Sequence, residues 1–179
     1  MEIITYPLKS TLIGAPIELP EHVRKARAMH SLTHEYWSGR PFNDKYCFFR
    51  AYALHTGTAA TALENRKKAL VSDLEKHTKR SFKNGVDLDS LAAIEIYFKV
   101  SVNVYSLGED GRAELIRISK LNYDVMHLNL YQDHFSYIKN IRKYAKQFQC
   151  IVCERILNRS GNLRAHLKIY SVEREEVYV

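Results

Sequence analysis

The chain has few of the features that mark secreted and membrane proteins. Its 179 residues include three cysteines, four prolines and one tryptophan. Three thiols cannot all pair with one another, and no apolar run approaches the roughly 20 residues that a membrane-spanning helix needs. The N-terminal sequence MEIITYPLKS lacks the basic region followed by an apolar region that forms a secretion signal. We therefore expect an intracellular protein, cytoplasmic or nuclear, with no membrane partner.

The composition is that of a globular protein with one main core. Hydrophobic residues make up 46% of the chain and charged residues 26%, which is ordinary for a soluble domain. The length suffices for one domain and a small appendage, but not for two full domains. Helical patterns come first and alternating patterns second. We therefore expect an α+β fold in which helices pack on a small antiparallel sheet.

Periodicity and turn residues give the expected elements. Helices are expected over 20–33, over 47–55 before Gly57, from Thr58 to about Lys79, and over 86–100, where Asp87 and Asp89 are candidate N-caps. Strands are expected over 101–107 and 114–119, joined as a hairpin by the turn GEDG, and over 126–132 and 134–140.

The positive charge of the chain belongs to one segment. Residues 139–168 carry eight basic residues and one acid, a local charge of +7, which equals the net charge of the whole chain. An anionic partner is therefore expected for this segment and not for the body. We expect two domains, a body over 1–140 and a basic appendage over 141–179.

The stretch NDKYCFFR, residues 43–50, places a cysteine where a helix is expected to begin. The unpaired N–H groups and the positive end of the helix dipole favour a thiolate at Cys47. The same N–H groups, with those of the loop 44–46, can bind an oxyanion. A cysteine nucleophile also needs a base. Of the eight histidines, His134 is the best placed, because it opens an expected strand.

The sequence DKYCFFRA, from Asp44, resembles the nucleophile motif of the OTU (ovarian tumour) cysteine proteases, Asp-Gly-Asn-Cys-hydrophobic-Phe-Arg-Ala. LDSLAAIEIYFKVSVNVYSL and MHLNLYQDHFSYI are similar to the later helix, strand and histidine segments of that family. The resemblance implies a papain-like fold in which Cys47 is the nucleophile, His134 the general base and the loop at Asp44 a source of oxyanion donors. It also implies a deubiquitinase that cleaves after the C-terminal glycine of ubiquitin or a ubiquitin-like protein.

The residue that orients the imidazole is open. The family commonly has Asn or Asp two positions after the histidine, whereas this chain has Ser136. A serine hydroxyl orients an imidazole more weakly than a carboxylate and carries no charge to stabilise imidazolium. Gln132, Asn129 and Asp44 are the other candidates, each dependent on what the fold brings together.

The basic appendage carries a zinc-finger pattern that lacks its last ligand. Cys150, Cys153 and His166 have the spacing of a Cys2His2 finger, but 170–172 read Tyr-Ser-Val. The pattern predicts one structural zinc with an incomplete ligand set, completed by water, Glu173 or another chain. A metal-free ββα unit and a decayed finger are the alternatives. No cofactor is expected for catalysis.

The order of the two parts is similar to N-terminal modules of protein-primed family B DNA polymerases from Polinton (Maverick) type transposons. That resemblance implies a segment of a larger product. Two further functions stay open. The chain can be a weak or inactive OTU-like module that binds protein, or nucleic acid without sequence specificity through residues 139–168, or it can be a self-processing protease.

Overall fold

The structure is a computed structural model that describes residues 18–24, 27–110, 112–145, 148–149, 156–157, 161–162 and 164–168. The helices of the body are α1 (Glu21–Arg24), α2 (Cys47–His55), the short 3-10 helix η1 (Ala60–Ala62), α3 (Leu63–Thr78), α4 (Leu91–Phe98) and α5 (Ile141–Ala145). Its strands are β1 (Met29–His30), β2 (Val100–Leu107), β3 (Ala113–Arg117), β4 (Asp124–Tyr131) and β5 (His134–Ile138).

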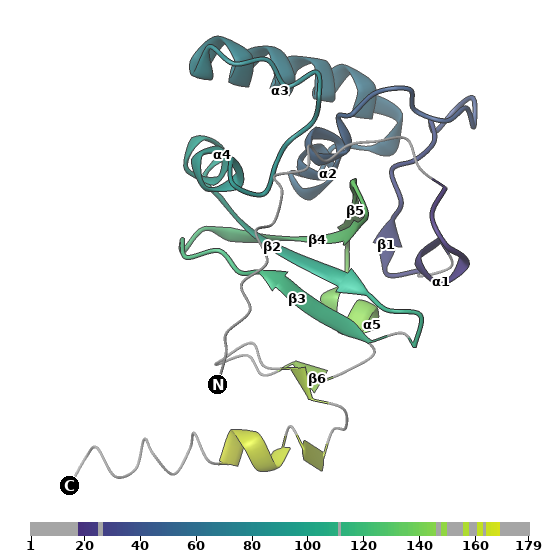
Figure 1. Cartoon of the computed structure of the whole chain (residues 1–179), viewed down its shortest axis with the longest axis vertical. Helices are drawn as coiled ribbons and strands as arrows, with labels where there is room; N and C mark the ends of the chain where they lie inside the picture. The colour runs from purple at the N-terminus through teal and green to yellow at the C-terminus, as the bar shows by residue number, and fades with distance from the viewer. Residues whose placement is uncertain are drawn as a thin grey trace, which may run out of the picture.

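The five strands form one sheet in the order β1-β5-β4-β2-β3. Helices α2, α3 and α4 lie on one side of this sheet, and α5 lies on the other (Figure 1). The expected α+β class is therefore confirmed. The expected helix at 47–55 has the bounds of α2, and the four expected strands are present as β2 to β5.

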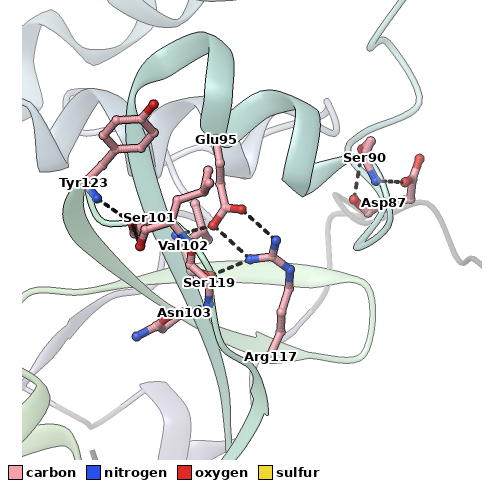
Figure 2. Close-up of polar contacts among 10 residues, drawn as sticks. Asp87, Ser90, Glu95, Ser101, Val102, Asn103, Arg117, Ser119 and Tyr123 are labelled. Carbon is pink, nitrogen blue, oxygen red and sulfur yellow. Dashed lines mark hydrogen bonds and ion pairs between the residues drawn. The ribbon is translucent and has the colours of Figure 1, made fainter. Parts of the chain in front are cut away.

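One pairing in the sheet corrects the expectation of an antiparallel arrangement. β2 pairs antiparallel with β3 but parallel with β4, with Val100 opposite Asp124. The hairpin places β3 on one edge of β2, so the following loop has to cross β2 before β4 can pair with the other edge. Ser101 holds this crossing, since its hydroxyl donates to the carbonyl of Leu121 at 2.8 Å. The same hydroxyl accepts the N–H of Tyr123 at 3.0 Å (Figure 2).

A second correction concerns the first expected helix, which is much shorter than 20–33. α1 ends at Arg24, and Met29 and His30 form β1, the edge strand beside β5. Ile138 and Tyr137 are their antiparallel partners. The pairing continues by one residue, since the N–H of Lys139, just after β5, donates to the carbonyl of Ala28, just before β1, at 2.9 Å. Sheet hydrogen bonds thus take the backbone groups that a continued helix would have used.

Two apolar cores lie on opposite faces of the sheet. The larger joins α2, α3 and α4 to one face and includes Phe49, Leu74, Val102, Met126, Leu128 and Phe135. The smaller lies on the other face and includes Met29, Tyr105, Leu107, Ile138 and Tyr144. Because Tyr144 of α5 is 2% exposed, the packed body extends past the expected boundary at 140.

The C-terminal part has the element order of the expected finger. β6 (Phe148–Gln149) pairs antiparallel with β7 (Ile156–Leu157), and residues 161–162 and 164–168 are helical. In the ranges that the structure describes, no helix is both long and apolar enough to cross a membrane.

A buried ion pair locks α4 to the sheet where the β2–β3 ladder stops. Glu95, 1% exposed, accepts the N–H of Val102 at 2.6 Å and both terminal nitrogens of Arg117 at 3.0 and 2.7 Å (Figure 2). Arg117 also donates to the carbonyl of Val102 at 2.6 Å. The two side chains therefore supply the donor and the acceptor that a continued β3 would have supplied to Val102.

We expect Arg117→Met to lower the free energy of unfolding by about 2–4 kcal/mol, because Glu95 would keep a buried charge without its cation. Urea denaturation measures the change. The double variant Arg117→Met/Glu95→Gln should recover part of the loss, since glutamine still accepts the N–H of Val102. Arg112→Ala, in an exposed pair with Asp110, should cost less than about 0.5 kcal/mol. A loss below about 1 kcal/mol for Arg117→Met contradicts this role.

Candidate active site

Cys47 begins α2 and lies against the first residues of β5. The N-cap residue Tyr46 makes no side-chain capping hydrogen bond. The sulfur of Cys47 accepts the backbone N–H of Phe135 at 3.4 Å. The structure thus brings together the segments of Cys47 and His134, which are far apart in the sequence. Both side chains are buried, with 2% of Cys47 and 3% of His134 exposed.

The imidazole of His134 is held by a backbone carbonyl. Its Nε2 lies 2.6 Å from the carbonyl oxygen of Ser31, just after β1. A carbonyl only accepts, so Nε2 carries the proton, and in the neutral ring Nδ1 is then the basic nitrogen. The hydroxyl of Ser136 donates to the same oxygen at 3.3 Å. Ser136 therefore shares the acceptor of His134.

The expected side-chain candidates for orienting His134 have other partners. The amide oxygen of Asn129 accepts the hydroxyl of Tyr144 at 2.6 Å. The carboxylate of Asp44 binds Arg50. Gln132 lies in the turn between β4 and β5, with a φ of 48°. The orienting group that sequence reasoning missed is the carbonyl of Ser31, and no residue type marks a backbone carbonyl in a sequence.

Asp44 belongs to a network of four charged side chains. Its two oxygens accept the two terminal nitrogens of Arg50, both at 2.7 Å, and Lys67 binds at 3.0 Å. Glu64 binds the Nε of Arg50 at 2.6 Å and Lys67 at 2.8 Å. Burial disfavours ionisation of Asp44, but the hydrogen bonds from Arg50 and Lys67 outweigh it and hold its pKa below the ordinary value. The side chain of Asp44 therefore fixes the loop before α2, and its part in catalysis stays a prediction.

The loop before α2 contributes fewer oxyanion donors than expected. The N–H of Tyr46 donates to the carboxylate of Asp44 at 3.1 Å, so that donor is occupied. Further donors lie in the first turn of α2, where the N–H groups of Cys47 and Phe48 precede the first intrahelical hydrogen bond, from Arg50 to Tyr46. An oxyanion beside the sulfur of Cys47 would therefore meet the helix N-terminus more than the loop.

The burial of Cys47 acts against the thiolate that is expected from its place at a helix start. Burial raises the pKa of Cys47 to about 11, although the N–H groups of Phe135 and Phe48 and the charge of Arg50 favour the ionised form. Desolvation is thus larger than the stabilisation that the helix start provides. Any nucleophilic reaction of Cys47 near neutral pH needs a base to take its proton.

The expected zinc ligands are only partly within the described residues. Cys150 and Cys153 lie outside them. His166 lies in the helical residues 164–168 and is partly exposed. Among the residues that the structure describes, no group of three His, Cys, Asp or Glu side chains is arranged to hold a metal ion. The zinc site therefore stays a prediction.

No family model matches the chain, and no curated protein and no solved structure matches it either. A functional assignment therefore has to come from the geometry around Cys47 and His134. Three groups define that geometry, namely the first turn of α2, the start of β5 and the carbonyl of Ser31.

Arg50→Lys should lower the free energy of unfolding by about 2–3 kcal/mol, although the charge is kept. One ammonium group cannot reproduce the planar fork that binds Asp44 and Glu64 together, nor the stacking of the guanidinium 3.5 Å from the ring centre of Phe42. Urea unfolding gives the value. Arg66→Lys, an exposed position on α3, is the matched control and should stay within about 0.5 kcal/mol. Equal stability of Arg50→Lys and wild type would refute a scaffold role for the network.

The labelling of Cys47 by iodoacetamide should rise about tenfold per pH unit from pH 7 to pH 10, because the pKa of its thiol is raised and the thiolate is the reactive form. Site-resolved mass spectrometry separates Cys47 from the other two cysteines. In the protein unfolded in urea, the labelling rate of Cys47 should instead level off above the ordinary thiol pKa of about 8.5. A plateau below pH 8 in the folded protein would show a preformed thiolate and contradict the burial effect.

Proposed function

We propose that the chain is an OTU-like cysteine isopeptidase that hydrolyses the bond after the C-terminal glycine of ubiquitin or a ubiquitin-like protein. The observation that carries the proposal is the position of Cys47 at the start of α2 against Phe135, beside a histidine whose Nε2 binds the carbonyl of Ser31. A helix-borne cysteine and a strand-borne histidine with a fixed tautomer are the parts that thiol-dependent acyl transfer requires.

The proposed reaction starts from the neutral thiol. Nδ1 of His134 takes the proton as the sulfur of Cys47 attacks the glycine carbonyl, and N–H groups at the start of α2 hold the oxyanion. The imidazolium then gives its proton to the leaving lysine amine, and the C–N bond breaks. Water, deprotonated by His134, hydrolyses the thioester and releases the carboxylate and the thiol. The carbonyl of Ser31 keeps the ring oriented through both steps.

The proposed enzyme rests in a closed form. Cys47 and His134 are almost inaccessible, so a substrate carbonyl reaches the sulfur only after neighbouring residues move. Leu32, which follows Ser31, is buried in the same core cluster as Cys47 and has a φ of 57°. A left-handed conformation costs a non-glycine residue about 1 kcal/mol or more. We therefore assign to Leu32, which is strained and follows the carbonyl that binds His134, the movement that opens the site to substrate.

A non-catalytic binding module is the second candidate, and two observations favour it. The thiol of Cys47 is buried with a raised pKa, as in a core cysteine. Exposed basic residues of the segment 139–168, namely Arg142, Lys143, Arg164 and Lys168, suit phosphate contacts. DNA binding that weakens with salt and falls at least tenfold on deletion of residues 146–179, in a protein unreactive toward ubiquitin-type probes, would establish this candidate in place of the enzyme.

Ubiquitin or a ubiquitin-like protein carrying a C-terminal propargylamide should form a covalent adduct with the wild type and not with Cys47→Ala. His134→Ala should slow the labelling by about 100-fold or more, since the general base is lost. Ser136→Ala should slow it less than about tenfold, because the carbonyl of Ser31 still orients the ring. Intact-mass spectrometry follows the reaction, with Cys153→Ala as the cysteine control. Failure of every such probe, or equal labelling of Cys47→Ala, would refute the proposal.

A further inference from the structure

A cavity of about 320 Å³ lies beside the candidate active site, between residues 30–42 and the helices α2 and α3. Its apolar lining comes from Leu32, Phe42, Leu54 and Leu63. The volume is at the lower end of the range for small-ligand sites, and it suits one or two aliphatic side chains. The cavity is thus large enough for a side chain of a bound polypeptide.

The lining includes a rigid aromatic surface. Phe42 is 7% exposed, and the guanidinium of Arg50 stacks on its ring with 3.5 Å to the ring centre. The guanidinium is itself fixed by Asp44 and Glu64. The ion network that holds the start of α2 therefore also shapes the cavity.

The outer rim presents two exposed aromatic side chains. Trp37 is 79% exposed and Tyr36 is 64% exposed, and their rings meet edge to face with centres 5.1 Å apart. A tight turn holds them outward, with the N–H of Glu35 donating to the carbonyl of Arg40 at 2.8 Å. Gly39 closes the turn with a φ of 62°. Tryptophan and tyrosine are enriched at the centres of binding interfaces, so this rim is suited to contact a partner chain.

One carboxylate at the cavity, that of Glu35, forms no ion pair with a cation of the described residues. Glu35 accepts the hydroxyl of Ser38 at 2.5 Å, and no Lys, Arg or His of the described ranges forms an ion pair with it. Glu64, which also lines the cavity, is paired with Arg50 and Lys67. Within the described part of the chain, Glu35 thus carries the negative charge at the cavity that no cation balances, and this charge favours a basic side chain in the occupant.

The cavity shares two residues with the surroundings of Cys47 and His134. Ser31 and Leu32 line it. The carbonyl of Ser31 binds His134, and Leu32 shares the buried cluster of Cys47. A polypeptide that fills the cavity therefore contacts the residue that binds His134 and a residue of the core cluster that contains Cys47.

We propose that this cavity is a polypeptide-binding site, in which an aliphatic side chain fills the space over Phe42 and an adjacent basic side chain pairs with Glu35. The inference deepens the proposed function, on which it rests, because it assigns the site to a segment of the substrate polypeptide. Trp37 at the rim contacts the backbone of that segment.

The single tryptophan of the chain reports on this site directly. We would titrate Cys47→Ala, which cannot turn over, with acetyl-Leu-Arg-Leu-amide and follow the emission of Trp37. A saturable blue shift is expected. Acetyl-Leu-Gln-Leu-amide should bind about 3–10-fold more weakly, as fits one exposed ion pair, and acetyl-Gly-Arg-Gly-amide should give no saturation. Equal binding of all three peptides would overturn the proposal.

Three further substitutions in the Cys47→Ala background sharpen the test. Ala60→Phe narrows the cavity and should weaken acetyl-Leu-Arg-Leu-amide at least tenfold, with an unchanged circular dichroism spectrum. Glu35→Gln should remove the preference for arginine over glutamine, whereas Glu114→Gln, an exposed acid on β3, should leave it intact. Unchanged binding in Ala60→Phe contradicts the site. The peptide titrations do not need the thiol of Cys47, so they test the cavity independently of the ubiquitin-probe labelling. A negative result in one experiment does not affect the interpretation of the other.

Discussion

The ion network of Asp44, Arg50, Glu64 and Lys67 is the constraint on which the candidate site depends. Arg50 is 1% exposed and Lys67 is 6% exposed, so neither charge would be tolerated there without its carboxylates. The network ties the loop before α2 to the helix that it precedes and to α3. Through Arg50 it also fixes Phe42. The position of Cys47 and the shape of the neighbouring cavity thus follow from one set of interactions.

Two consequences of this packing act in opposite directions. The helix start and the N–H of Phe135 stabilise negative charge on the sulfur of Cys47, but the burial that holds the sulfur there costs more, and its pKa is raised to about 11. A thiol of this kind reacts only if a neighbouring base takes the proton. In the proposed reaction His134 takes that proton, because the carbonyl of Ser31 leaves its Nδ1 as the basic nitrogen. The proposed chemistry is therefore coupled proton transfer and attack, not attack by a stored thiolate.

Local patterns predicted what depends on local residues. The bounds of α2 agree with the structure because an apolar window ends at Gly57, and β2 to β5 agree because their residues alternate along the chain. Alternation does not say which strands pair, so the parallel pair of β2 and β4 was missed. The sequence shows the motif around Cys47, but it does not show that the side chain of Asp44 binds Arg50. The carbonyl of Ser31 could not be found, because any residue type supplies one.

The central claim is that His134 is held as the proton acceptor for Cys47. The most direct test is the tautomer of His134 in the folded protein, measured by long-range nitrogen-proton correlation in solution near pH 7.5. The account predicts a proton on Nε2 and a bare Nδ1, because Nε2 donates to the carbonyl of Ser31. A proton on Nδ1 of the neutral ring would leave no base for the thiol and would contradict the claim.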